Sequence, residues 1–125
     1  MSEPLRVAVT GLGRGDVARA LQSAVGIEPL AMGDMEAATR LADGEVSYVV
    51  GVCESGGGAA LAMTIAVVGA DVCVNLSKMG RPIDADRLPG LLADGARAFG
   101  VARDHVPLVV PALARALSER AAAGT

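Results

Sequence analysis

Short β-branched runs alternate with amphipathic stretches along this chain, and this alternation constrains its fold more than any other feature. The run "LRVAVT" at residues 5–10 ends in glycines and predicts a buried first strand. In the next stretch, apolar residues recur at the spacing of one helix face, from Val17 to Val25. Strands that alternate with helices form parallel sheets with right-handed crossovers. The sequence therefore predicts an α/β fold, with one doubly wound, Rossmann-like or flavodoxin-like domain over residues 1–125 and a frayed tail at 121–125.

Further runs extend the predicted sheet. Strands are expected at residues 27–32, 47–52 and 71–76, and Pro29 favours an edge position for the first of these. Residues 96–101 are either a short fifth strand or the end of a helix. The expected strand order is 2-1-3-4, with strand 5 beyond strand 4 if it exists.

Each connection between these strands is expected to carry a helix. Asp34 can cap the second helix. Its inward residues would be Met35, Ala38, Leu41 and Ala42. The third helix, over residues 57–68, is apolar on all sides and needs cover on both faces, for which a subunit interface is one candidate. Asp84 or Asp86 can start the fourth helix, and Asp104 can cap the last one.

Composition limits the kinds of protein this chain can be. Hydrophobic residues make up 52% of it and aromatic residues 2%, with a mean hydropathy of +0.46. So much apolar surface on a small body favours a homo-oligomer. The net charge of −3 does not provide the positive charge that nucleic-acid binding requires. No run reaches the ~18 apolar residues that membrane insertion needs. The start of the chain lacks a signal-peptide pattern, so we expect a cytoplasmic protein.

The topology predicts where a ligand would bind. In open α/β sheets, ligands bind outside the carboxyl ends of the strands, at the point where the strand order reverses. Here that point lies between strands 1 and 3, which are followed by "GLGRGD" (residues 11–16) and "CESGGG" (residues 53–58). The loop "SKMGRP" (residues 77–82) is expected next along the same edge. We therefore expect the three loops to surround one crevice.

Glycines in two of these loops favour an anion at that crevice. Residues without Cβ let backbone N–H groups approach a ligand, and the first turn of a helix leaves such groups unpaired. The alternative is that tight turns and close helix–sheet packing need glycine. The predicted ligand-binding residues are Gly11, Gly13, Arg14, Glu54, Gly56, Gly57, Gly58, Lys78 and Arg81. A dinucleotide fingerprint fits poorly, because Gly15 comes one residue early, and Asp34 equally serves as a helix cap.

Cys53 and Ser55 are the predicted catalytic residues. A thiol beside a helix N-terminus can act as a nucleophile or as a base for a carbon-bound proton, although a free cysteine often only fills space. Ser55 can stabilise an oxyanion or cap its own helix, and Glu54 can assist Cys53 or face solvent. Cys73 is expected in the core and His105 at the surface or as a cap. No cluster has metal-ligand spacing, so no metal or cofactor is expected.

Two resemblances follow from these residues. Over nearly its whole length, through "DMEAA" (34–38), "VGVCESGGGAALAMTIAVVG" (50–69) and "AFGVARDHV" (98–106), the chain resembles a group of small bacterial proteins known only as a domain of unknown function. Locally, "VGVCESGGGAALAM" is similar to the strand–loop–helix of B-type ribose-5-phosphate isomerases. That resemblance implies that Cys53 is the base that moves a proton and that Ser55 assists at the enediolate, while the loop glycines hold it.

The sequence differs from the isomerase family at several positions of this motif and after the first strand. Glu54 replaces a glycine, Thr64 stands where those enzymes carry Asn, and an Asp-His pair after their first strand is absent. The sequence thus predicts a protein that binds a small anionic, phosphorylated metabolite, with isomerase-like proton transfer if it is an enzyme. The alternative is a non-catalytic regulatory or carrier-like subunit of a transport or metabolic assembly.

Overall fold

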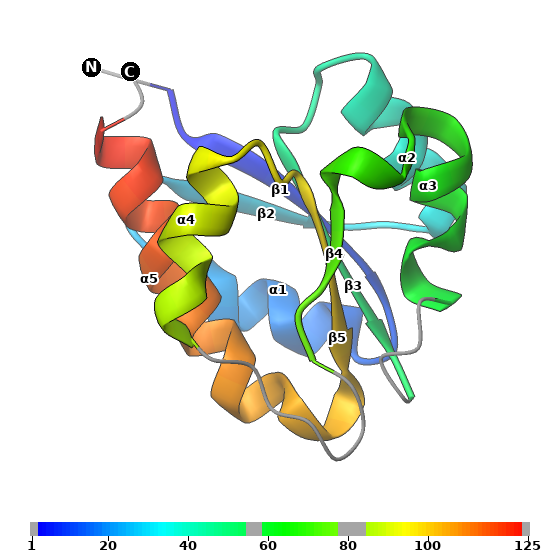
Figure 1. Cartoon of the computed structure of the whole chain (residues 1–125). Helices are drawn as coiled ribbons and strands as arrows, with labels where there is room; N and C mark the ends of the chain where they lie inside the picture. Colours follow the sequence, from blue (N-terminus) through cyan, green and yellow to red (C-terminus); the bar gives the residue numbers. More distant parts are fainter. Residues whose placement is uncertain (1–2, 55–58, 78–84, 124–125) are drawn as a thin grey trace.

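The computed structural model describes residues 3–54, 59–77 and 85–123. In these residues the chain forms a five-stranded parallel sheet with helices on both faces (Figure 1). The strands are β1 (Leu5–Gly11), β2 (Ile27–Ala31), β3 (Tyr48–Cys53), β4 (Cys73–Asn75) and β5 (Ala98–Ala102). The helices are α1 (Arg14–Gln22), α2 (Asp34–Ala42), α3 (Ala62–Val68), α4 (Leu88–Ala93) and α5 (Val106–Ala123). The predicted α/β fold class is confirmed.

The sheet order is β2-β1-β3-β5-β4, so the last two strands are exchanged relative to the expected order. All five residues of β5 are buried, whereas β4 has only three residues and none of them is buried. An all-apolar strand is stable where both faces and both edges are covered, which explains the interior position of β5. The edge position predicted from Pro29 is confirmed, because β2 pairs only with β1 in the described sheet.

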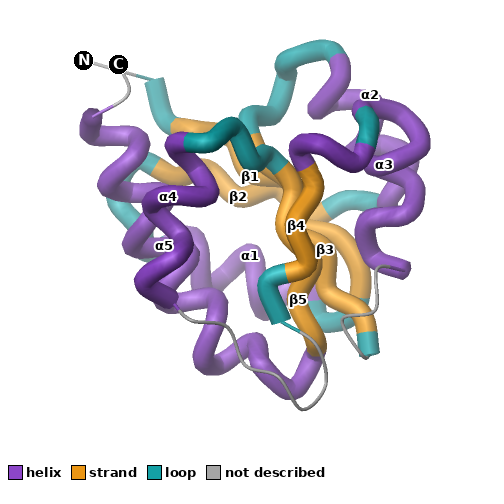
Figure 2. The backbone as a smooth tube through the Cα atoms, in the orientation of Figure 1, coloured by secondary structure: helices purple, strands orange, loops and turns teal. Residues whose placement is uncertain are grey.

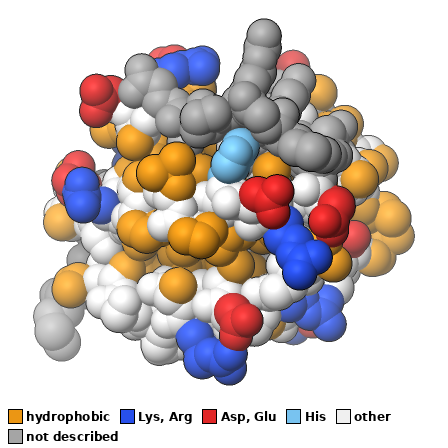
Figure 3. Space-filling model, turned by 90° about the horizontal axis from the view of Figure 1, so that it is seen from below, with side chains coloured by type: hydrophobic (Ala, Val, Ile, Leu, Met, Phe, Trp, Pro, Cys, Tyr) orange, Lys and Arg blue, Asp and Glu red, His pale blue; other side chains and the backbone are white. Residues whose placement is uncertain are grey.

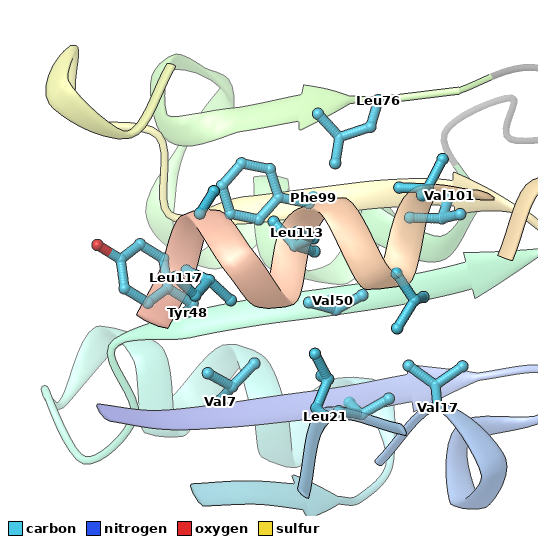
Figure 4. Close-up of a cluster of buried hydrophobic side chains, with 14 of the residues drawn as sticks. Val7, Val17, Leu21, Tyr48, Val50, Leu76, Phe99, Val101, Leu113 and Leu117 are labelled. Atoms are coloured by element: carbon cyan, nitrogen blue, oxygen red, sulfur yellow. The ribbon is translucent and has the colours of Figure 1, made fainter. Parts of the chain in front are cut away.

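Two layers of helices cover the sheet. Helices α1, α4 and α5 lie on one face, and α2 and α3 lie on the other (Figure 2). The larger core cluster lies under the first group, where Phe99 packs among Val50, Leu113 and Leu117 (Figure 4). The Tyr48 and Phe99 rings stack with centroids 6.2 Å apart. Short 3₁₀ turns at residues 59–61, 70–72, 85–87 and 103–105 complete the connections, with the first of them packed on the face of α2 and α3.

Several predicted helix details are wrong. Gly33, not Asp34, is the N-cap of α2, and Asp34 is its first residue. The buried face of α2 is Ala37, Ala38 and Leu41, while Met35 is 56% exposed and Ala42 is also exposed. Asp104 lies inside the 3₁₀ turn at residues 103–105 that precedes α5, and not at the cap position predicted for it. A glycine therefore precedes α2 and a 3₁₀ turn precedes α5, while Ala38 and Leu41 of α2 are buried as predicted.

Helix α3 is shorter than the sequence predicts. It begins at Ala62 after a 3₁₀ turn, and Thr64 is its only buried residue. Ile65 and Val67 are 38% and 43% exposed, so one side of this apolar helix has no cover within the described chain. Among the described residues, no helix has both the length and the apolar character that a membrane crossing requires.

Candidate functional site

The carboxyl ends of β1, β3 and β5 meet at the lower edge of the sheet in Figure 1. Because β5 pairs with β3, the segment after β5 takes the place that the sequence assigned to the loop after β4. Arg103 and Glu54 join the two strand ends through an exposed ion pair of 3.4 Å. The other predicted site residues here, Ser55, Gly56, Gly57, Gly58, Lys78 and Arg81, lie outside the described residues.

Gly11 and Gly13, at the end of β1 and the start of α1, have different roles. Gly11 is the last residue of β1 with φ +89°, and a Cβ there would lie 2.0 Å from the carbonyl oxygen of Val52. This glycine therefore permits the close approach of β1 to β3. Gly13 is the left-handed N-cap of α1, with φ +65° and open space around its Cβ position. Only the second glycine leaves room for a ligand.

Arg14 extends away from β3. Its Nη1 donates a hydrogen bond of 2.9 Å to the carbonyl oxygen of Met32, which follows the edge strand β2. The side chain thus ties the start of α1 to the end of β2. The structure does not bring this guanidinium to Arg103 and Glu54, which lie at the ends of β5 and β3.

A cavity of about 400 Å³ opens at this edge, between the first turn of α1 and the start of α5. It is lined by Leu12, Gly13, Asp16, Val17, Val52, Arg103, Val106 and Pro107. Figure 3 looks onto the molecule from below, where hydrophobic side chains gather near the centre and charged ones surround them. Asp16 forms an ion pair with Arg19, and Arg103 forms one with Glu54, so both charged residues of the lining have partners.

Cys53 lies at the edge, on the other face of the sheet. It is the last residue of β3, as predicted, and is half-buried. Side chains alternate along a strand, so Val52 faces α1 and α5 while Cys53 faces the side of α2 and α3. The thiol and the cavity are therefore separated by the rim of the sheet. A ligand that reaches both must cross that rim.

A row of residues that the sequence analysis did not single out lies on the same face as Cys53. Thr10, Gly51, Gly100 and Asn75 are neighbours in register across four strands. A Cβ at Gly51 would lie 2.9 Å from the carbonyl oxygen of Ala60, and one at Gly100 would lie 2.5 Å from Asn75 Oδ1. The two glycines let the 3₁₀ turn at residues 59–61 and the Asn75 side chain lie directly on the sheet.

Thr10 Oγ1 and His105 Nδ1 are buried near this edge and have no hydrogen-bond partner among the described residues. Thr10 is 1% exposed at the end of β1, and His105 is half-buried just after β5. Ser77, also buried, accepts a 2.9 Å hydrogen bond from the amide of Ala102. Thr10, Asn75 and Ser77 could have been found as the polar residues that end apolar strands, but the missing partners appear only in the structure.

The remaining candidates have structural roles. Cys73 is half-buried against the smaller core cluster, and its Sγ donates to the carbonyl oxygen of Gly69 at 3.4 Å. Burial raises the pKa of the Cys73 thiol, which disfavours the reactive thiolate. Within residues 3–54, 59–77 and 85–123, no three His, Cys, Asp or Glu side chains are grouped so that they could hold a metal ion.

Comparison with known proteins places the chain in a family. A family model described as "Protein of unknown function DUF2620" matches residues 5–117. The chain is 31% identical over 110 residues to "Uncharacterized protein YhfU" of Escherichia coli K12, a match that covers 86% of this chain and 94% of the relative. YhfU of Shigella flexneri matches with the same identity and coverage. The whole-chain resemblance to small bacterial proteins is therefore confirmed. This chain belongs to the DUF2620 family of proteins of unknown function.

Proposed function

We propose that this protein binds a small anionic, phosphorylated metabolite at the carboxyl edge of its sheet. The observation that carries the proposal is the cavity of about 400 Å³ where the N-terminal turn of α1 and the Arg103 guanidinium line the same space. The first-turn amides of a helix have no partners within the helix, and they attract phosphate groups. Leu12, Val52 and Val106 supply apolar walls, as small-molecule pockets commonly have.

The exposed ion pair between Arg103 and Glu54 can open, so that a ligand anion takes the place of the Glu54 carboxylate. Arg103 and Glu54 are 62% and 70% exposed, and an ion pair this open contributes about 0–1 kcal/mol. A phosphate in the cavity can therefore replace the carboxylate at low energetic cost. The Asp16 carboxylate repels an anionic ligand, but its ion pair with Arg19 weakens this repulsion.

Ligand-induced stabilisation tests the proposal. The protein is heated with inorganic phosphate and with a panel of phosphorylated sugars, and a rise in melting temperature that saturates with concentration is expected for a bound ligand. Arg103→Gln should reduce the shift. Arg87→Gln removes the same charge from an exposed site outside this cavity and should leave it unchanged. A panel that produces no shift, or equal shifts in both variants, contradicts the proposal.

If the protein is an enzyme, we propose isomerase-like proton transfer, with Cys53 as base and Ser55 at the oxyanion. Support comes from the half-buried thiol at the end of a central strand and from the local resemblance to B-type ribose-5-phosphate isomerases. Exchange of a carbon-bound proton with deuterated solvent, followed by NMR on each ligand that binds, is the direct assay. Cys53→Ala should abolish exchange while binding persists. Exchange that survives this substitution excludes the thiol as base.

The second candidate is a non-catalytic regulatory or carrier-like subunit, in the form of a cytoplasmic homo-oligomer. The exposed apolar side of α3, with Ile65 and Val67, favours it. Light scattering coupled to size-exclusion chromatography should then give a mass above that of one chain. Ile65→Glu should lower that mass. Val25→Glu, at an 83% exposed position on the other side of the sheet, is the matched control. A monomeric wild-type protein contradicts this reading.

A further inference from the structure

A second cavity lies at the opposite, amino edge of the sheet. It measures about 370 Å³ and is bounded by the starts of β1, β3 and β5 and by the last turns of α4 and α5. Its apolar floor consists of Leu5, Leu92, Ala96 and Ala121. None of its lining residues lines the carboxyl-edge cavity, which lies at the other end of the strands.

Arg97 gives this cavity an unbalanced charge. Its side chain is half-buried, and its Nε donates to the carbonyl oxygen of Ser47 at 3.3 Å. Among the described residues, Arg97 has no carboxylate partner. Other arginines of the chain do have one: Arg6, Arg19, Arg40 and Arg103. The Ser47 carbonyl replaces only part of the hydration that this partly buried cation loses, and it carries no full negative charge, so the site favours an added anion.

Two more donors line the same space. Arg120, in the last turn of α5, brings a second guanidinium that also has no carboxylate partner among the described residues. Tyr48 lies beside it, and Figure 4 shows its hydroxyl oxygen at the outer end of the ring, pointing away from Phe99 and Val50. Among the described residues that line the cavity, Glu3 is the only acidic one. Two guanidinium groups therefore face one carboxylate.

We propose that this amino-edge pocket binds a small organic oxyanion, a carboxylate or phosphate monoester that carries an apolar group. The guanidinium groups of Arg97 and Arg120 hold the oxyanion, which matches their planar donor geometry. The Tyr48 hydroxyl donates a further hydrogen bond, and the apolar group lies on the floor of Leu5, Leu92 and Ala96. Binding here does not depend on the carboxyl-edge site.

Calorimetric titration at low ionic strength tests the pocket, with benzoate and phenyl phosphate as probes and inorganic phosphate as the anion without an apolar group. Both aromatic probes should bind more tightly than inorganic phosphate. Arg120→Gln should weaken their binding by about 1.5-fold to fivefold, the range for a solvent-screened charged contact. Tyr48→Phe should weaken it by about twofold to tenfold, the range for one neutral hydrogen bond. Glu3→Gln should strengthen it.

Control variants separate this site from others. Arg87→Gln removes an exposed arginine outside the pocket, and Arg103→Gln removes the guanidinium of the carboxyl-edge cavity; neither should change the affinity for the aromatic probes. Arg97→Lys keeps the charge but loses the hydrogen bond to Ser47, so circular dichroism must first show that this variant is folded. No binding at millimolar probe concentration, or equal loss in Arg120→Gln and Arg87→Gln, overturns the proposal.

Discussion

Replacing Gly11 by alanine should destabilise the protein far more than replacing Gly13, although the two glycines are only two residues apart and both have positive φ. At Gly11, with φ +89°, the new methyl would lie 2.0 Å from the backbone carbonyl oxygen of Val52. At Gly13, with φ +65°, the methyl would meet nothing within 4 Å. The two substitutions therefore share backbone strain, and only the first adds a collision with a central strand.

The magnitudes follow from these contacts. A left-handed conformation costs a non-glycine residue about 1–2 kcal/mol, which is the whole expected effect of Gly13→Ala. The collision at Gly11 adds about 1–3 kcal/mol, as overpacking does, because β1 and β3 must move apart. The separation also weakens the 3.0 Å hydrogen bond from Leu12 N to Val52 O, worth about 0.5–1.5 kcal/mol. We expect a total loss of about 2.5–6.5 kcal/mol for Gly11→Ala.

Urea unfolding, followed by far-ultraviolet circular dichroism, measures both losses. The midpoint should fall strongly for Gly11→Ala and slightly for Gly13→Ala, with an unchanged slope in each case. Equal destabilisation by the two variants would refute the assignment of Gly11 to strand packing. The same pair is informative for ligand binding, because Gly13→Ala should leave the fold intact while it places a methyl at the N-cap of α1, beside the carboxyl-edge cavity.

Three other predictions concern residues of the sheet. Thr10→Val should stabilise the protein by about 1–2 kcal/mol in urea unfolding, because it removes a buried hydroxyl that has no partner in the described part of the chain; a loss of stability would contradict this. Phe99→Ala should cost about 3–5 kcal/mol by the same measurement, since the ring is fully buried in the larger core cluster. Burial raises the pKa of the Cys73 thiol above its usual 9.0, so the folded state holds that proton more tightly than the unfolded chain. Stability should therefore decline as the pH rises above about 9, and Cys73→Ala should flatten this decline in unfolding measured from pH 7 to 10.

The alternation of strands and helices was sufficient to predict the fold class, but not the position of the last strand. "AFGVA" is short and follows a turn, so its sequence is compatible with a strand or a helix end. Its insertion between β3 and β4 depends on contacts between residues distant in the chain, such as the pairing of Val50 with Phe99. Local periodicity carries no information on such pairing.

The sequence predicted the location of the candidate site better than the residues that form it. Placement of Cys53 at the end of a central strand followed from the predicted third strand and from the rule for parallel sheets. In the sequence, Gly11 and Gly13 look alike. Only the distance from the Gly11 Cβ position to the Val52 carbonyl oxygen shows that Gly11 serves strand packing, whereas Gly13 lies beside open space. Arg103 was missed because it adjoins Glu54 only when β5 pairs with β3.

The interior position of β5 also has a consequence for how the chain is made. In the described sheet, β4 hydrogen-bonds only to β5, so residues 73–75 have no strand partner until residues 98–102 have left the ribosome. Until then the edge of β3 is open, and its sequence "YVVGVC" is uncharged and apolar. Such an edge invites pairing with another chain. We therefore expect the growing chain to be prone to aggregation until β5 pairs with β3, and truncation before residue 98 should leave that edge open.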